Sequence, residues 1–156
     1  MVSLALLVRE LLEVVTDRDD ISVIKNIASK LDIEFSSLST LNDLISDQIK
    51  LESDIIYLIS KYSRIHDSVN ISLEEMRGIM QMHMPSEFGG RKVTKELSEA
   101  IMLSDQNYLK LKREVLKWDN LCRTLQTIQR MIFNRDRKLE IISNNYRKEM
   151  KFDESN

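Results

Sequence analysis

The segment from about Leu97 to Met150 constrains the fold more than any other feature, because an apolar stripe runs through a long series of charged residues. Apolar residues recur there at intervals of three and four, which places them on one face of an α-helix. An apolar face of this length is stable only when another surface covers it. The stripe comprises Tyr108, Leu111, Val115, Trp118, Cys122 and Leu125, and it continues more loosely through Ile132 and Leu139.

Two different surfaces could cover this apolar stripe. A continuous helix from Ser104 to Met150 would be about 70 Å long at a rise of 1.5 Å per residue, and no compact monomer of this size buries such a rod along its whole length. We therefore expect the stripe to pack against further copies of the chain, as a helical bundle or ring. The alternative is an intramolecular contact with a helix at 41–68. A bend near residues 134–136 is compatible with either arrangement.

The composition predicts an all-α fold. Only three Gly and one Pro occur in 156 residues, whereas a β-rich fold needs many Gly-marked reversals. The helical spacing of apolar residues predicts short N-terminal helices over about 2–16 and 20–31, and a longer one over 41–68. An Asp in the run 17–20 is a good N-cap for the second of these helices.

A further short helix is expected after a break around Asn70. Ser72 and Glu75 have the spacing of a capping box, which opens a helix ending near His83. Its apolar face is rich in Met, a residue that fills cores and also suits adaptable partner surfaces, core filling being the commoner role. The residues of that face are Met76, Ile79, Met80 and Met82.

The strongest breaker in the chain is the segment 84–90. Pro85 ends the preceding helix, and two consecutive glycines supply a flexible joint. Cations follow the glycines at once and an aromatic residue precedes them, so the loop is a candidate polyanion-binding site. A plain linker is the alternative. The residues concerned are Phe88, Arg91, Lys92 and Lys95.

The net charge of −2 conceals a division between the two halves of the chain. Residues 1–88 hold 8 Lys and Arg against 15 Asp and Glu, whereas residues 89–156 hold 15 against 10. Such asymmetry indicates either complementary packing of subunits or a basic face offered to a polyanion. A solvated helix surface without a binding role is the alternative.

No residue pattern in the chain indicates catalysis. The three glycines form no phosphate-binding or dinucleotide-binding motif, and His66 and His83 lack the spacing of metal ligands. Without a nucleophile–base pair, we expect no enzymatic activity, no catalytic or metal-binding residue and no cofactor. The single Cys122 lies on the apolar stripe and is expected to be a small buried hydrophobe.

The first residues give no indication of a membrane span. Met1 to Val15 is rich in Leu and Val, but Arg9, Glu10 and Glu13 interrupt it and it is too short to cross a bilayer. No small-residue cleavage site follows. We therefore expect a cytoplasmic protein with no membrane partner.

Several short motifs resemble the UvsY family of bacteriophage recombination mediators, over about Asp43 to Met150. Ser60-Lys61-Tyr62 resembles the family's Ser-Lys-aromatic motif, and Phe88-Gly89-Gly90 resembles its aromatic-Gly turn. The family's short basic motif before that turn is kept only in Arg77. The best match is Ser104-Asp105-Gln106-Asn107-Tyr108-Leu109-Lys110 with Val115, Leu116 and Trp118, and Cys122, Leu125, Ile128 and Arg135 continue in step.

The resemblance implies an all-helical, non-enzymatic protein that assembles through its C-terminal helices into a ring. It also implies that the protein binds single-stranded DNA, loosens the single-strand-binding protein and helps load a RecA-like recombinase. This would occur in phage recombination and repair, in the host cell cytoplasm. The candidate DNA contacts are Lys61, Arg64, Arg77, Arg91, Lys92 and Lys95.

These expectations divide the chain linearly. The parts are an N-terminal helical extension (1–40), a helical DNA- and partner-binding region (41–88), a flexible basic joint (89–95), the long C-terminal oligomerisation helices (96–152) and a tail (153–156). The alternative function is a helical oligomeric scaffold or adaptor that binds only proteins. Salt-sensitive affinity for single strands would distinguish the mediator from the adaptor.

Overall fold

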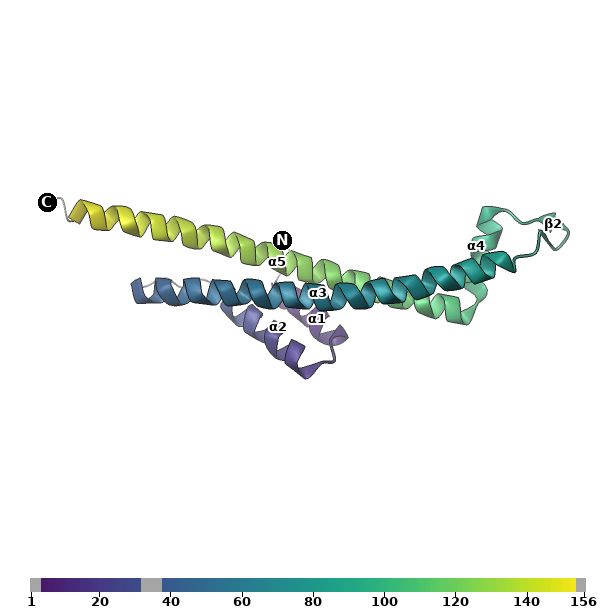
Figure 1. Cartoon of the computed structure of the whole chain (residues 1–156), viewed down its shortest axis with the longest axis horizontal. Coiled ribbons are helices and arrows are strands. Elements are labelled where there is room, and N and C mark those ends of the chain that lie inside the picture. Colours follow the sequence, from purple (N-terminus) through teal and green to yellow (C-terminus); the bar gives the residue numbers. More distant parts are fainter. Residues whose placement is uncertain (1–3, 32–37, 154–156) are drawn as a thin grey trace. The chain divides into compact units, whose positions relative to one another are not determined.

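The protein is all-α, as its composition predicts (Figure 1). The computed structural model describes residues 4–31 and 38–153, so most of the expected tail lies outside the described residues. No helix within those ranges is both long enough and apolar enough to cross a membrane. The elements are α1 (Leu4–Val14), α2 (Arg18–Lys30), α3 (Leu38–Met82), β1 (Glu87–Phe88), β2 (Arg91–Lys92), α4 (Lys95–Ser104) and α5 (Gln106–Asp153).

An Asp caps α2, as the sequence predicts. The Asp17 carboxylate accepts hydrogen bonds from the backbone N–H groups of Asp19 and Asp20, at 2.9 and 3.4 Å. These bonds satisfy donors that have no partner inside the helix. The helix consequently begins at Arg18, slightly earlier than its apolar spacing indicates.

A second Asp divides the long C-terminal stretch, which the sequence pattern presented as one segment. Asp105 has an extended backbone, with φ −77° and ψ 123°, and therefore ends α4. Its carboxylate accepts hydrogen bonds from the backbone N–H groups of Asn107 and Tyr108, both at 2.9 Å, and so caps α5. From Gln106 to Asp153 the helix is uninterrupted, and residues 134–136 are helical.

The break expected around Asn70 was wrong, because α3 continues through it to Met82. Ser72 does not act as an N-cap. Its hydroxyl instead donates to the carbonyl of Ser68, one turn earlier, at 3.2 Å. A Ser that bonds back in this way is compatible with a helix interior, so the spacing of a capping box was misleading here.

The chain forms two compact units. Unit 1 comprises Met1–Ser60 and Arg123–Asn156, and unit 2 is the single stretch Lys61–Cys122. The helices α3 and α5 each contribute one part to each unit. The units group the described residues by their contacts, whereas the division expected from the sequence follows the order of the chain and stays a prediction.

Unit 1 joins four helical segments around one apolar core. Leu11 of α1, Ile24 of α2, Leu51 of α3 and Ile132 of α5 are at most 2% exposed. The helices α1 and α2 form a hairpin next to the N-terminal half of α3 in Figure 1. An ion pair between Lys30 and Asp47 joins α2 to α3.

A buried arginine connects three helices of unit 1. Arg135 on α5 is 2% exposed. Its Nε donates to the Lys30 carbonyl at the end of α2 at 3.0 Å. Its Nη1 donates to the carbonyl of Leu44 at 3.1 Å and to Oε1 of Gln48 at 2.7 Å, both on α3. Burial lowers the pKa of Arg135, and the nearby carboxylates of Asp47 and Asp136 oppose that shift.

Gln48 completes this network from the α3 side. The side chain is 4% exposed, and its Nε2 donates to the Ile132 carbonyl at 3.1 Å and to the Glu52 carboxylate at 2.7 Å. The Gln48 amide therefore satisfies both its own donors and one donor of Arg135. A connected buried network of this kind fixes the register of the helices that it joins.

Unit 2 is held by a smaller, Met-rich core. Leu73, Met102 and Tyr108 are buried together, and Met76, Met80, Met84, Leu111 and Val115 pack against them. Beside this core, the rings of Tyr62 and Trp118 stack with centroids 5.8 Å apart and planes inclined by 20°. The expectation that Met fills the core is confirmed for Met76 and Met80. Ile79 and Met82 of the same predicted face are 55% and 78% exposed.

The apolar stripe of the C-terminal helix is covered within one chain. In unit 1, Leu125, Ile132 and Leu139 are at most 3% exposed. In unit 2, Tyr108 and Cys122 are at most 9% exposed, Leu111 and Val115 lie on the Met-rich core, and Trp118 stacks on Tyr62. The intramolecular alternative therefore accounts for the stripe, and oligomerisation through these residues would require unpacking them.

Replacing Arg135 with Gln should lower the free energy of unfolding by roughly 3 kcal/mol, because two helix carbonyls and Gln48 lose a charged donor. Arg137→Gln is the matched control. Arg137 is exposed two residues further along the same helix, so its replacement should change stability by less than about 0.5 kcal/mol. Urea unfolding followed by circular dichroism measures both values. Equal losses would contradict the role assigned to Arg135.

Candidate nucleic-acid interface

A tight β-turn occupies the place of the expected flexible joint. Gly89 and Gly90 have φ angles of 59° and 74°. A two-residue hairpin turn of type I′ requires positive φ at both central positions, and glycine adopts such angles without steric cost. The glycine pair thus defines one backbone path between two short strands.

The pairing of the strands separates the side chains onto two faces. Phe88 lies opposite Arg91, and Glu87 lies opposite Lys92. Directly opposed residues of an antiparallel pair project from the same face, and neighbours along a strand project from opposite faces. One face therefore carries an aromatic ring and a guanidinium, whereas on the other the charges of Glu87 and Lys92 oppose each other.

The hairpin is an exposed part of unit 2. It follows the C-terminal end of α3 and precedes α4, and it projects from both (Figure 1). Phe88 is 56% exposed, and Arg91 and Lys92 are exposed as well. A ring that the chain leaves uncovered next to a cation is available to stack on a flat ligand.

Lys95 extends this group of cations into the first turn of α4. The Thr94 hydroxyl caps the helix by accepting a hydrogen bond from the Leu97 N–H at 3.3 Å. A backbone hydrogen bond lowers the pKa of Glu96, and a hydrogen bond with the Thr94 side chain lowers it further. The ionised carboxylate of Glu96 partly offsets the charge of Lys95, so the face with Phe88 and Arg91 is the clearest anion-attracting part of the loop.

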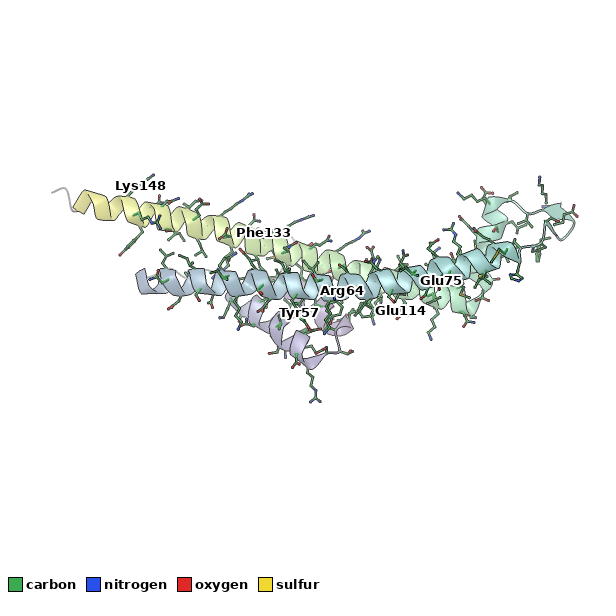
Figure 2. The ribbon with its side chains drawn as sticks, in the orientation of Figure 1. Tyr57, Arg64, Glu75, Glu114, Phe133 and Lys148 are labelled. Atoms are coloured by element: carbon green, nitrogen blue, oxygen red, sulfur yellow. The ribbon has the colours of Figure 1, made fainter. Side chains whose placement is uncertain are left out.

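The structure does not bring the six candidate DNA contacts together. Lys61 and Arg64 lie on α3, and Arg64, which Figure 2 labels, precedes the end of the helix by about 27 Å at 1.5 Å per residue. The Lys61 ammonium lies 5.9 Å from the centre of the Tyr62 ring. Only Arg91, Lys92 and Lys95 lie at one place, in and directly after the hairpin.

Arg77 lies at a small cavity of mixed charge. The cavity, of about 270 Å³, has an apolar lining of Leu, Met and Tyr side chains with Glu74, Glu99 and Lys112 at its polar parts. Arg77 is 3.7 Å from the Glu74 carboxylate, one turn earlier on α3. Two carboxylates at the same cavity oppose its cations, so Arg77 is poorly placed to hold a phosphate.

Cys122 has the surroundings of a structural residue. It is 9% exposed, and burial raises the pKa of its thiol. A hydrogen bond with Ser63 lowers that pKa, and the carboxylates of Asp119 and Asp67 raise it. Among the residues that the structure describes, no group of three His, Cys, Asp or Glu side chains could hold a metal ion.

Comparison with known proteins gives no match to a family model, to a curated protein or to a solved structure. The candidate interface therefore depends on the geometry of the hairpin.

Two aspects of the interface were missed at the level of sequence. The hairpin itself was expected as a flexible joint, although a Gly-Gly pair between two short non-helical runs is a recognised signal for a tight turn. The separation of Glu87 from Arg91 follows from the strand register alone. Reading the turn as type I′ would have given that register and placed Phe88 with Arg91.

Replacing Gly89 with Ala should destabilise the hairpin by about 1 kcal/mol, because a side chain is strained at a φ of 59°. Gly78→Ala is the matched control. Gly78 lies inside α3, and a Cβ added there meets no atom within 4 Å. That variant should gain about 0.5–1 kcal/mol. Cross-strand nuclear Overhauser effects should weaken only in Gly89→Ala, and their persistence there would contradict the assigned turn.

Proposed function

We propose that the protein binds single-stranded nucleic acid through the β1–β2 hairpin and acts as a non-enzymatic recombination mediator. The observation that supports binding is the exposed Phe88 directly opposite Arg91 on one hairpin face. Proteins that bind single strands combine cations, which contact phosphates, with aromatic rings, on which unstacked bases lie. The hairpin presents both on a backbone whose turn is defined by two glycines.

The mediator role rests on the resemblance to the UvsY family, whose motifs fall at this hairpin and at the start of α5. In this role the protein loosens a single-strand-binding protein and helps load a RecA-like recombinase onto the exposed strand, in phage recombination and repair in the host cell. A homo-oligomer, as a bundle or ring, would repeat the hairpin, and repeated weak contacts raise the overall affinity for one strand.

Assembly of several copies would use surfaces other than the apolar stripe of α5. In unit 1, Ile45, Ile49 and Ile56 lie on one side of α3 and are 41%, 68% and 52% exposed. Their spacing of four and seven residues places them in one row. A second copy is a suitable cover for such a row, because its burial would remove three large apolar side chains from water.

A helical adaptor that binds only proteins is the second candidate function. The observation that favours it is a group of exposed apolar side chains on α3 in unit 2, namely Ile71, Ile79 and Met82. They lie within about 80° of one another around the helix, at 100° per residue. An adaptor would use this surface and would have no affinity for nucleic acid.

Replacing Arg91, Lys92 and Lys95 with Glu should abolish most binding to a thymidine oligonucleotide at low salt. For wild-type protein, three phosphate contacts predict that the logarithm of the affinity falls with the logarithm of the salt concentration with a slope of about −2. Fluorescence anisotropy of a labelled strand measures both the affinity and the slope. The triple variant should lose at least about tenfold in affinity.

The matched control changes three exposed cations elsewhere by the same charge: Arg18, Lys25 and Lys50 to Glu. This control should retain nearly all of the wild-type affinity. Wild-type protein without affinity for single strands at low salt would leave the adaptor as the better proposal. Equal losses in the two triple variants would mean that only net charge matters, and the hairpin would then not be the interface.

The mediator step has its own measurement. ATP hydrolysis by a RecA-like recombinase, on single strands already coated with single-strand-binding protein, should start sooner when the protein is added. The hairpin triple variant should lose this effect and the control triple should keep it. A protein that binds single strands but leaves the delay unchanged is a nucleic-acid-binding protein without mediator activity.

A further inference from the structure

The outward side of α5 in unit 1 carries a row of cations with an aromatic residue between two of them. We define the outer stripe as Arg130, Phe133, Arg137, Ile141 and Lys148, all of which are exposed. Figure 2 labels Phe133 and Lys148 on the edge of α5 that is turned away from α3. None of these residues belongs to the hairpin or to the apolar stripe that the sequence analysis identified.

Helix geometry places this stripe opposite the core of unit 1. Leu125, Ile132 and Leu139 mark the buried side of α5. Successive steps of seven and eleven residues, from Arg130 to Arg137 and on to Lys148, each return to within about 20° of the same direction. That direction is roughly 180° from Ile132 and Leu139, so the three cations form one row along the outside of the helix.

From Gln126 to Lys148, no acidic residue lies in line with the three cations. The other positions on this line are mostly amides and apolar side chains, whereas the carboxylates of Asp136 and Glu140 lie on the side of the line that carries Phe133. No ion pair among the described residues involves Arg130, Arg137 or Lys148. The polar non-cationic positions of the row are Gln126, Asn134 and Asn144.

We infer that the outer stripe of α5 is a second contact for single-stranded nucleic acid, in which Arg130 and Arg137 hold phosphates and Phe133 stacks on a base. Phe133 is 47% exposed, and it follows Arg130 by three residues and precedes Arg137 by four. Residues three and four apart are neighbours on a helix surface. The ring is therefore flanked by a guanidinium on each side, which is the combination that single-strand binding uses.

The dimensions of the row suit a strand of nucleic acid. Arg130 and Arg137 are about 10.5 Å apart along the helix axis, and Arg130 and Lys148 about 27 Å, at 1.5 Å per residue. At the rise of 3.4 Å per nucleotide in one strand of duplex DNA, the longer distance corresponds to about eight nucleotides, and a more extended single strand covers it with fewer. Arginine is suited to this task because its planar guanidinium can bond two phosphate oxygens at once.

The composition of the row favours a nucleic acid over an acidic protein as its binding partner. A protein partner would be expected to meet a larger apolar centre, whereas Phe133 and Ile141 are separated by about 12 Å along the axis and by Arg137 between them. Amides next to arginines suit phosphate and base edges, which offer many acceptors. This inference rests on the proposed single-strand binding but not on the hairpin as its site.

The test compares Arg130→Gln/Arg137→Gln with Lys25→Gln/Lys50→Gln, a control pair of exposed cations on α2 and α3 of the same unit. The probe is a labelled thymidine oligonucleotide of about thirty residues, which is longer than the outer stripe alone requires. The outer-stripe pair should reduce the steepness of the salt dependence by about 1.4, or about 0.7 for each phosphate that an arginine no longer neutralises. The control pair should leave the slope unchanged.

Phe133 is tested separately, with an oligonucleotide of the same length that lacks bases as the second probe. Phe133→Ala should weaken binding to the thymidine strand by roughly 5- to 150-fold, which corresponds to the loss of one stacked base. It should leave binding to the abasic strand unchanged. Phe133→Trp should retain the wild-type affinity, since tryptophan also provides a ring for stacking. Thermal unfolding of each variant verifies that the helices are intact.

Each outcome separates this inference from the proposed function. Outer-stripe variants that match the control pair, while the hairpin variant loses affinity, would overturn the second contact and leave the hairpin proposal standing. Wild-type protein that binds neither probe at low salt would overturn both. Sedimentation measures the mass of the assembly in parallel. If Arg130→Gln/Arg137→Gln forms a smaller assembly than wild-type protein and also binds more weakly, the stripe joins copies of the chain, and the inference of direct contact is wrong.

Discussion

The burial of one side of α5 against other helices of the same chain determines most of what this protein presents to its surroundings. In unit 1 the buried side includes Arg135, whose guanidinium bonds to α2 and α3. In unit 2 it includes Tyr108, and Trp118 stacks beside it, so that both pack on residues of α3. Because the apolar side is used internally, the opposite side is fixed as the outward one. The arginines on that opposite side of α5 are exposed for this reason.

Aromatic and cationic side chains reach the surface by two different structural means. In the hairpin, the strand register pairs Phe88 with Arg91 across a glycine turn. On α5, helical periodicity sets Phe133 between two arginines. The first depends on positive φ angles that only glycine adopts freely, whereas the second depends on the position of a buried face. A substitution that disturbs one of these arrangements should therefore leave the other unchanged.

Patterns dictated by backbone chemistry were predicted well from the sequence. The all-α class followed from the scarcity of turn-forming residues, and the cap at Asp17 from the preference of helix starts for Asp. A local signal with two meanings failed, because Ser72 resembled an N-cap but bonds back to Ser68. The cap at Asp105, which separates α4 from α5, was not identified. The stripe itself was recognised, but periodicity alone cannot state which surface covers it. Phe133 was overlooked because its significance depends on knowing that the opposite face is buried.

The division into units has a consequence for the order in which a growing chain can fold. Unit 2 is one uninterrupted stretch and contains all its residues once Cys122 has been made. Unit 1 is discontinuous, since α1, α2 and the first part of α3 must wait for Arg135 and the residues around it. During synthesis from the N-terminus, the apolar sides of these early helices stay without their final cover while the middle of the chain is translated. The segment made last thus completes the core begun by the segment made first.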